Sequence, residues 1–210
     1  PVVPENPLVP ARGGEFGLRS VVVSGLQTTM ALWYLSFDSE LIFVGDAGIA
    51  EASRPSQRYG LEWTNYLKLT PWLVGELDVS VSRAEFSDDD PAGSLVPGAL
   101  DRVVSGAISV LPSQRVYGSV RLRHFGPRPL VEDGSRMSAA TTIWNGEVSV
   151  RINERLTLVV EVFNLLNSSV SDIDYFYTSR LPGEPLDGVG DIHFHTSIPR
   201  TARVKLDVTF

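Results

Sequence analysis

The sequence predicts an all-β protein that forms part of an antiparallel, up-and-down transmembrane β-barrel. Three observations lead to this expectation. Apolar and polar residues alternate with a period of two in nine segments, no stretch of helical length repeats every 3.6 residues, and tight turns alternate with long polar connections. Because successive side chains of a strand point to opposite faces, each segment predicts a strand with one apolar and one polar face.

The first four predicted strands cover residues 15–23, 27–44, 57–69 and 73–86. Apolar and aromatic residues recur at alternate positions in these segments and predict the apolar faces: Phe16, Leu18 and Val22; Ala31, Trp33, Leu35, Phe37, Leu41 and Phe43; Tyr59, Leu61, Trp63 and Leu67; Leu77, Val79 and Val81. The polar face of the second strand is expected to hold Tyr34, Ser36, Asp38 and Glu40.

The other five predicted strands cover residues 100–111, 115–125, 141–152, 156–163 and 201–210. The same alternation predicts their apolar faces, which are expected to hold Val104, Ile108 and Val110; Val116, Val120 and Leu122; Val148, Val150 and Ile152; Leu156, Leu158, Val160 and Val162; Val204, Leu206, Val208 and Phe210. Several of the nine strands exceed ten residues, near the length of about 9–11 that crosses a bilayer at a tilt.

The connections sort into two kinds. Tight turns are expected at Ser24-Gly25, Thr70-Pro71, Pro112-Ser113 and Asn153-Glu154, and long polar loops near residues 45–56, 87–99, 126–140 and 164–192. The two kinds alternate, so an up-and-down sheet has all its short turns at one end. Outer-membrane barrels have this asymmetry, with short periplasmic turns and longer extracellular loops. A soluble β-sandwich is the alternative, because its strands also have one buried face.

Composition excludes several classes of function. The chain has 210 residues, no cysteine, a net charge of −7 and no run of about 18 apolar residues, so we expect no disulfide, no thiolate chemistry and no transmembrane helix. No basic patch stands out, which argues against a nucleic-acid partner. No Gly-x-Ser-x-Gly, His-Glu-x-x-His or phosphate-loop motif is present, so we expect neither an enzyme nor a cofactor. Prolines at positions 1, 4, 7 and 10 predict an extended entry segment over residues 1–12, before a barrel portion over 13–210.

The C-terminal third carries a more specific pattern. The stretch VFNLLNSSVSDIDYFYTSRLPGEP and the following DIHFHTSIPRTARVKLDVTF resemble the C-terminal end of the TonB-dependent outer-membrane receptors, in which an aliphatic strand runs into a Phe-Asn-Leu-Leu-Asn element and the last strand ends on an aromatic residue. The earlier segments ALWYLSFDSELIFVGDAG, RPSQRYGLEWTNYLKLTPWL and FSDDDPAGSLVPGAL resemble barrel hairpins of this family.

The resemblance implies a receptor in the cell outer membrane that takes up a scarce ligand of the siderophore, cobalamin or oligosaccharide class. Its partners are then outer-membrane lipid, a small-molecule ligand and a TonB complex that acts through an N-terminal plug. Barrels of this family have about 22 strands around the plug. The chain has nine predicted strands and no plug, so we expect a C-terminal portion of the barrel, an open curved sheet whose missing partners are the N-terminal strands and the plug. A passive porin or structural barrel, and a soluble β-sandwich binding module, are the alternative functions.

Three sets of residues follow from this interpretation. The lumen-facing set comprises Glu62, Glu76, Asp78, Arg121, Arg123, Glu147, Arg151, Glu161, Arg203, Lys205 and Asp207. The lipid-facing set comprises Val204, Leu206, Val208 and Phe210. The ligand-binding set, expected at the extracellular mouth, comprises Asp172, Asp174, Tyr175, Tyr177, Arg180, Asp191, His193 and His195.

Two features of the mouth leave alternatives open. If the last strand extends back through Asp191, His193 and His195, these side chains share the lumen side with Arg203 and Lys205 and form a ligand or metal site; the alternative is a polar strand end that bonds to neighbouring loops. The acidic runs at residues 88–90 and 172–174 suit a divalent cation or a solvated loop. Spacing alone is a weak metal signal, so we expect no metal site.

Overall fold

The computed structural model describes residues 9–21, 23–39, 41–44, 49–52 and 54–210, and residues 1–8 of the predicted entry segment lie outside this range. The described strands are β1 (Ala11–Ser20), β2 (Leu26–Phe37), β3 (Leu41–Val44), β4 (Ile49–Ala52), β5 (Ser56–Thr70), β6 (Leu73–Phe86), β7 (Arg102–Ser113), β8 (Val116–Phe125), β9 (Thr141–Asn153), β10 (Leu156–Phe163), β11 (Ser171–Ser179), β12 (Val189–Thr196) and β13 (Thr201–Val208). Among these residues we find no helix suited to span a membrane.

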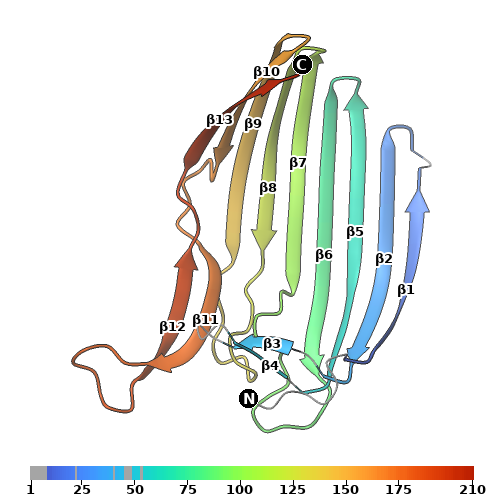
Figure 1. Cartoon of the computed structure of the whole chain (residues 1–210). Helices are drawn as coiled ribbons and strands as arrows, with labels where there is room; N and C mark the ends of the chain where they lie inside the picture. The colour runs from blue at the N-terminus through green and yellow to red at the C-terminus, as the bar shows by residue number, and fades with distance from the viewer. Residues whose placement is uncertain (1–8, 22, 40, 45–48, 53) are drawn as a thin grey trace.

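Nine of the strands form one antiparallel sheet in the order β1-β2-β5-β6-β7-β8-β9-β10-β13. These nine are the predicted strands, so the predicted fold class, a partial up-and-down barrel sheet, is confirmed. Within the described residues β1 and β13 each pair with a single neighbour, which leaves both edges of the sheet open. The remaining strands form two small hairpins, β3–β4 and β11–β12, which belong to long connections (Figure 1).

The short and long connections lie at opposite ends of the sheet (Figure 1). The links β1–β2, β5–β6, β7–β8 and β9–β10 are tight turns at one end, where the C-terminal residue also lies. The links β2–β5, β6–β7, β8–β9 and β10–β13 are long and gather at the other end, which we call the loop end. The predicted separation of turns from loops is therefore confirmed, with turn positions shifted by at most two residues.

Strand register divides the nine-stranded sheet into a charged face and an apolar face. Directly opposite residues of neighbouring strands share a face, and the pairs Asp78–Ser105, Ser105–Arg123 and Glu147–Glu161 illustrate how one polar row continues across the sheet. The same register places all eleven residues of the predicted lumen-facing set on this charged face. Val204, Leu206 and Val208 lie on the opposite face, next to Val160, Leu158 and Leu156.

The apolar face has no protein cover among the described residues. Side chains spread across it from β1 to β13 remain between 58% and 68% exposed, namely Phe16, Leu18, Leu32, Ile108 and Val204. A soluble β-sandwich would bury such a face under a second sheet, whereas the two further sheets described are two-stranded hairpins of the long connections. The arrangement thus favours the barrel over the sandwich.

The predicted faces of the second strand are reversed. Ala31 lies opposite Glu62, and Trp33 lies opposite Gly60, so Ala31, Trp33 and Leu35 belong to the charged face. Met30, Leu32 and Tyr34 lie on the apolar face instead. Gly60 makes room for the Trp33 indole, since a Cβ atom at position 60 would lie 2.9 Å from Trp33 Cζ2.

The predicted 27–44 strand ends early, and the 164–192 loop is more ordered than expected. β2 leaves the sheet at Phe37, the residue where its pairing with both β1 and β5 ends, and residues 41–44 pair with β4. Asp191, His193 and His195 lie on β12, which pairs with β11 and is separated from β13 by residues 197–200. The last strand therefore does not extend back through the two histidines.

Packing within the protein concentrates at the loop end. Phe86, Val96 and Leu130 are buried there, with 3%, 2% and 7% exposure. Phe86 ends β6, whereas Val96 and Leu130 belong to the β6–β7 and β8–β9 connections. These two connections bond to each other through Leu95 N–H to Glu132 O (2.9 Å) and Gly98 N–H to Pro129 O (2.8 Å). The loop end is thus a packed structure with defined positions for polar side chains.

Candidate ligand-binding site

The β11–β12 hairpin holds seven of the eight residues of the predicted ligand-binding set, and Arg180 follows β11 directly. The base of the hairpin is fixed by Asn164 of the Phe-Asn-Leu-Leu-Asn element, whose side chain is buried. Its amide nitrogen donates to Ser168 O (2.9 Å) and Ile198 O (3.1 Å), and its amide oxygen accepts from Ser168 N–H (2.8 Å). One side chain therefore joins the segment that leaves β10 to the segment that enters β13.

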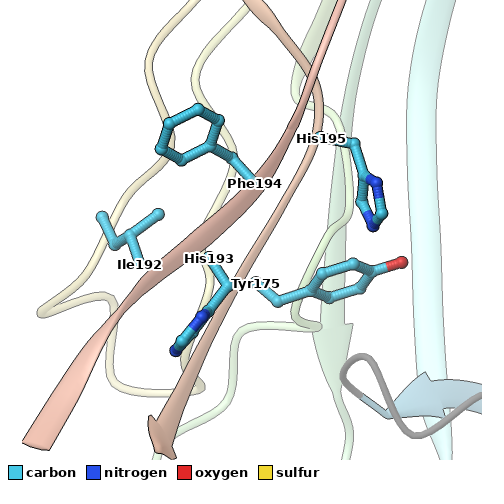
Figure 2. A pocket seen from close by; sticks show the side chains of 5 residues that line it. All are labelled: Tyr175, Ile192, His193, Phe194 and His195. Atoms are coloured by element: carbon cyan, nitrogen blue, oxygen red, sulfur yellow. The ribbon is translucent and has the colours of Figure 1, made fainter. Parts of the chain in front are cut away.

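Five residues of the predicted set share one face of the hairpin, which we call the Tyr/His face. The register pairs Tyr175 with His193 and Tyr177 with Asp191, and His195 continues the same row. The rings of Tyr177 and His193 stack with centroids 3.8 Å apart and an interplanar angle of 14°. In Figure 2 the side chains of Tyr175 and His195 lie on one side of the ribbon, and those of Ile192 and Phe194 on the other.

An open cavity of about 310 Å³ extends along β12; it is lined by Tyr175, His193 and His195 of the Tyr/His face and by Ile192 and Phe194 of the opposite face. Within the described part of the chain, His193 Nε2 is buried and has no hydrogen-bond partner. A buried ring nitrogen without a partner is costly, but this atom is closed off from the surface, so a ligand reaches it only if the stacked rings separate. The stacked rings provide flat apolar surface beside this polar atom. The geometry suits a small molecule that carries both a planar or apolar part and hydrogen-bonding groups.

The other three residues of the predicted set have different surroundings. Asp174 lies on the opposite face, is 8% exposed and pairs with Arg128 at 3.1 Å. Asp172 is exposed, and its backbone oxygen accepts a hydrogen bond from Arg128 (3.2 Å). Arg180 lies at the far end of the hairpin, where its Nε donates to Glu184 O (3.2 Å). The structure thus groups five of the eight residues on one surface and gives Asp174 a role in holding the hairpin.

The acidic run at residues 88–90 meets a single arginine. Arg54 contacts Asp88 (3.2 Å), Asp90 (3.7 Å) and Glu132 (2.7 Å), donates to Gly93 O (2.8 Å), and lies 4.1 Å above the centre of the Phe86 ring. Two of the three carboxylates in the run are therefore paired with protein. The described residues contain no group of three or more His, Asp or Glu side chains arranged to hold a metal ion.

Comparison with solved structures identifies the fold. The ferric yersiniabactin uptake receptor FyuA from Yersinia pestis matches 95% of this chain with a TM-score of 0.74 and 15% identity, and this chain covers 30% of FyuA. The ferric citrate transporter FecA matches 95% with a TM-score of 0.71 and 17% identity, with 31% of FecA covered. The ferric-catecholate import receptor Fiu from E. coli K12 matches 95% with a TM-score of 0.69 and 17% identity, with 27% of Fiu covered.

The fold is that of the TonB-dependent receptor barrel. The resemblance seen in the sequence is confirmed at this level, because solved receptors of that outer-membrane family share the arrangement of strands. The chain spans between 26% and 31% of the length of the chains in eight solved receptor and transporter structures that it matches. No protein-family model matches the sequence, and no curated protein does.

Charge is unevenly distributed over the chain. The four long connections, residues 38–55, 87–101, 126–140 and 164–200, carry 15 of the 25 acidic residues but only five of the 18 basic ones. The loop end is therefore strongly acidic by sequence, and the remainder of the chain is slightly basic. A field of one sign over a surface attracts ligands of opposite charge and repels those of like charge.

Three arginines that organise the long connections were not predicted as functional from the sequence. Arg54 joins three connections, Arg128 binds the hairpin through Asp174, and the guanidinium of Arg136 lies 5.3 Å from the centre of the Phe176 ring. A signal was present for Arg54, which is the single basic residue beside four acidic ones in residues 38–55. Their partners are 34 to 78 residues away in the Arg54 cluster, and sequence spacing does not reveal such pairs.

Proposed function

We propose that this chain is the C-terminal part of a TonB-dependent receptor that takes up a scarce small-molecule ligand across the outer membrane. The observation that carries the proposal is the two-faced sheet: eleven predicted lumen residues share one face, and the opposite face is apolar and uncovered from β1 to β13. A transmembrane barrel needs this division, because one face meets lipid and the other meets the lumen.

The proposal assigns a direction to each face and each end. Val204, Leu206, Val208 and Phe210 face lipid, and the eleven charged residues face the lumen. The loop end faces the exterior, as long loops do in outer-membrane barrels. The open edges at β1 and β13 pair with further strands of the same barrel, since exposed edges are liable to aggregate. Coupling to a TonB complex acts through a plug that occupies the lumen.

The ligand class follows from the Tyr/His face and the charge of the loop end. We propose that Tyr175, Tyr177, Asp191, His193 and His195 contact the ligand, with Arg180 and Asp172 near the rim and Asp174 in support. The acidic loop end favours uncharged or cationic members of the siderophore, cobalamin and oligosaccharide classes over polyanionic ones.

The test is uptake by cells that produce the complete protein. Outer-membrane fractionation and heat-modifiable gel migration check that the barrel forms. Uptake of a panel of labelled ferric siderophores, cobalamin and oligosaccharides is then measured with and without collapse of the proton-motive force. Energy-dependent uptake of one ligand supports the receptor; flux that is unchanged by the uncoupler would establish the alternative, a passive porin. A protein that stays in the soluble fraction contradicts both.

A further inference from the structure

The β8–β9 connection, residues 126–140, contains a small folded unit that braces the β11–β12 hairpin. Its two arms bond through Ser138 N–H to Arg128 O (2.9 Å), Arg128 N–H to Ser138 Oγ (3.1 Å) and Leu130 N–H to Arg136 O (2.8 Å). Leu130 and Ser138 are 7% and 6% exposed, so the unit is anchored in the packed part of the loop end. It offers a fixed support rather than a free loop.

Two side chains of this unit reach the hairpin, and both contact the same hairpin face. Arg128 binds the Asp174 carboxylate at 3.1 Å and the Asp172 carbonyl at 3.2 Å. Arg136 places its guanidinium over the Phe176 ring. Asp174 and Phe176 are two residues apart on β11, so they lie on one face. The Arg128 and Asp174 side chains are 13% and 6% exposed, which shields their attraction from water.

The Tyr/His face lies on the other side of the hairpin from these contacts. Tyr175 and Tyr177 alternate with Asp174 and Phe176 along β11, so fixing the latter pair directs the tyrosines to the other side. A two-stranded hairpin is marginally stable without further packing. Contacts outside the hairpin are therefore needed to fix its orientation about its own axis. Two contacts on one face supply that constraint.

We propose that Arg128 is a positioning residue for ligand binding: by holding Asp174 and the Asp172 carbonyl, it fixes the orientation in which the Tyr/His face is presented. This inference rests on the proposed function where it calls that face a ligand-binding surface. The mechanical part, that Arg128 sets the orientation of the hairpin, stands on the contacts alone. Arg128 lies on the opposite side of the hairpin from the rings and acts through Asp174.

Spin labels can test the orientation directly. The chain has no cysteine, so a label pair can be placed at Thr178→Cys on the hairpin and Ser87→Cys after β6, with any cysteines elsewhere in the complete protein replaced. Both positions are exposed. Distance distributions are measured by pulsed electron paramagnetic resonance on the purified barrel in detergent. We expect a narrow distribution in the parent and a clearly broader one in Arg128→Ala.

Three further variants make the result specific. Asp174→Asn should broaden the distribution as Arg128→Ala does, and the double variant should broaden it no further, because the two residues act as one unit. Arg128→Lys keeps the charge but not the planar fork, and should give an intermediate width; it also replaces Arg128→Ala if that variant fails to assemble. The control, Arg102→Ala, removes an exposed arginine that pairs only with its neighbour Asp101 in the described contacts and should leave the distribution narrow.

An unchanged distribution in Arg128→Ala, or in Arg128→Lys where it is the variant that assembles, would overturn the inference. Broadening by Arg102→Ala to the same extent would also overturn it, because the effect would then be general loosening. Uptake is scored separately: Arg128→Ala should raise the ligand concentration for half-maximal uptake about tenfold or more, with the maximal rate changed less. A parent that takes up no ligand refutes the receptor proposal while the label result still decides the role of Arg128.

Discussion

Glu161 on β10 and Arg203 on β13 form a two-point ion pair across the last strand pair of the sheet. Arg203 Nε lies 2.7 Å from Glu161 Oε2, and Arg203 Nη2 lies 3.0 Å from Glu161 Oε1. The two residues are directly opposite in register, and Glu147 is opposite Glu161 on the other side. Arg203 thus compensates for a like-charge pair on β9 and β10, which ties the end of the chain into the charged face.

This ion pair should contribute little to stability, and its contribution should depend on salt. The Arg203 side chain is 60% exposed, and exposed pairs are screened by water and ions. In a double-mutant cycle of Glu161→Gln and Arg203→Gln, we expect a small favourable coupling in urea unfolding at low salt that disappears at about 1 M NaCl, where the screening length is about 3 Å. A coupling that persists at high salt would mean that the Glu161–Arg203 pair is shielded from water and ions, contrary to this expectation.

Arg54 should hold three long connections together. Arg54→Ala removes the cation that contacts Asp88, Asp90 and Glu132 and leaves three carboxylates close to one another. Loss of a hydrogen bond to a charged group costs about 1.5–3 kcal/mol, so local opening of residues 87–101 should become about tenfold or more frequent. Protease cleavage of this segment on intact cells measures the opening. Equal cleavage in Arg54→Ala and the exposed-arginine control Arg102→Ala would refute the expectation.

The turn at the tip of the β8–β9 connection should loosen in acid. The backbone N–H of Ser135 donates to Asp133 Oδ1 (2.9 Å), and this bond, supported by the Ser135 hydroxyl, lowers the pKa of the Asp133 carboxyl from its usual value. Because the Asp133 carboxyl has a lower pKa in the folded turn than in the unfolded chain, its ionised form stabilises the turn at pH values above the pKa of the unfolded chain. This stabilisation is lost as the pH falls through the lower pKa of the folded turn. Amide exchange at Ser135, corrected for intrinsic rates, should therefore show reduced protection only below about pH 4. Asp133→Asn should remove this pH dependence.

The nine long strands could be predicted because their pattern and their turns agree. In β10, for example, Leu156, Leu158, Val160 and Val162 alternate with polar or shielded positions, and a tight turn precedes them. The faces of β2 could not be predicted, since Met30, Leu32 and Tyr34 are as apolar as Ala31, Trp33 and Leu35. Register against Glu62 and Gly60 decides between them, and register is a property of two strands rather than one.

The small hairpins and the loop contacts could not be predicted for a related reason. β11 and β12 are joined by a nine-residue link within a connection of 37 residues, so neither strand has a tight turn to mark it. Asp174 was expected to bind a ligand because it is acidic and close to aromatic residues, whereas it pairs with Arg128, 46 residues earlier in the chain. Tertiary pairing of this kind gives a polar residue a structural partner that its sequence neighbourhood does not show.

Asn164 should be the most sensitive position of the Phe-Asn-Leu-Leu-Asn element. Asn164 and Asn167 both have positive φ angles, 49° and 53°, so alanine is strained at either site. Only Asn164 is buried, and its amide makes three hydrogen bonds. We expect Asn164→Ala to cost about 1–3 kcal/mol more than Asn167→Ala in urea unfolding, because buried groups lose their partners. The exposed Asn167 side chain accepts one hydrogen bond, from Arg200 N–H (3.0 Å). Equal costs would therefore show that burial and the additional bonds of Asn164 add nothing to the backbone strain that both positions share.

The facing of β13 gives the most direct test of the barrel. Val204 is 68% exposed on the apolar face, whereas Lys205 lies on the charged face and pairs with Asp207 at 3.1 Å. If Val204 lies near the bilayer midplane, Val204→Arg should cost about 2–4 kcal/mol in the complete barrel refolded into phospholipid vesicles. Lys205→Val should cost much less, because it removes only an exposed ion pair.

The pair of variants separates lipid contact from general intolerance of β13 to substitution. Both change a single side chain at adjacent positions of the same strand, so backbone effects are matched. A neutral Val204→Arg together with a severe Lys205→Val would show that the faces are reversed and that the charged residues meet lipid. A severe effect of both would place protein on each side of β13, because a covered apolar face rejects arginine and a covered polar face loses the partners of Lys205.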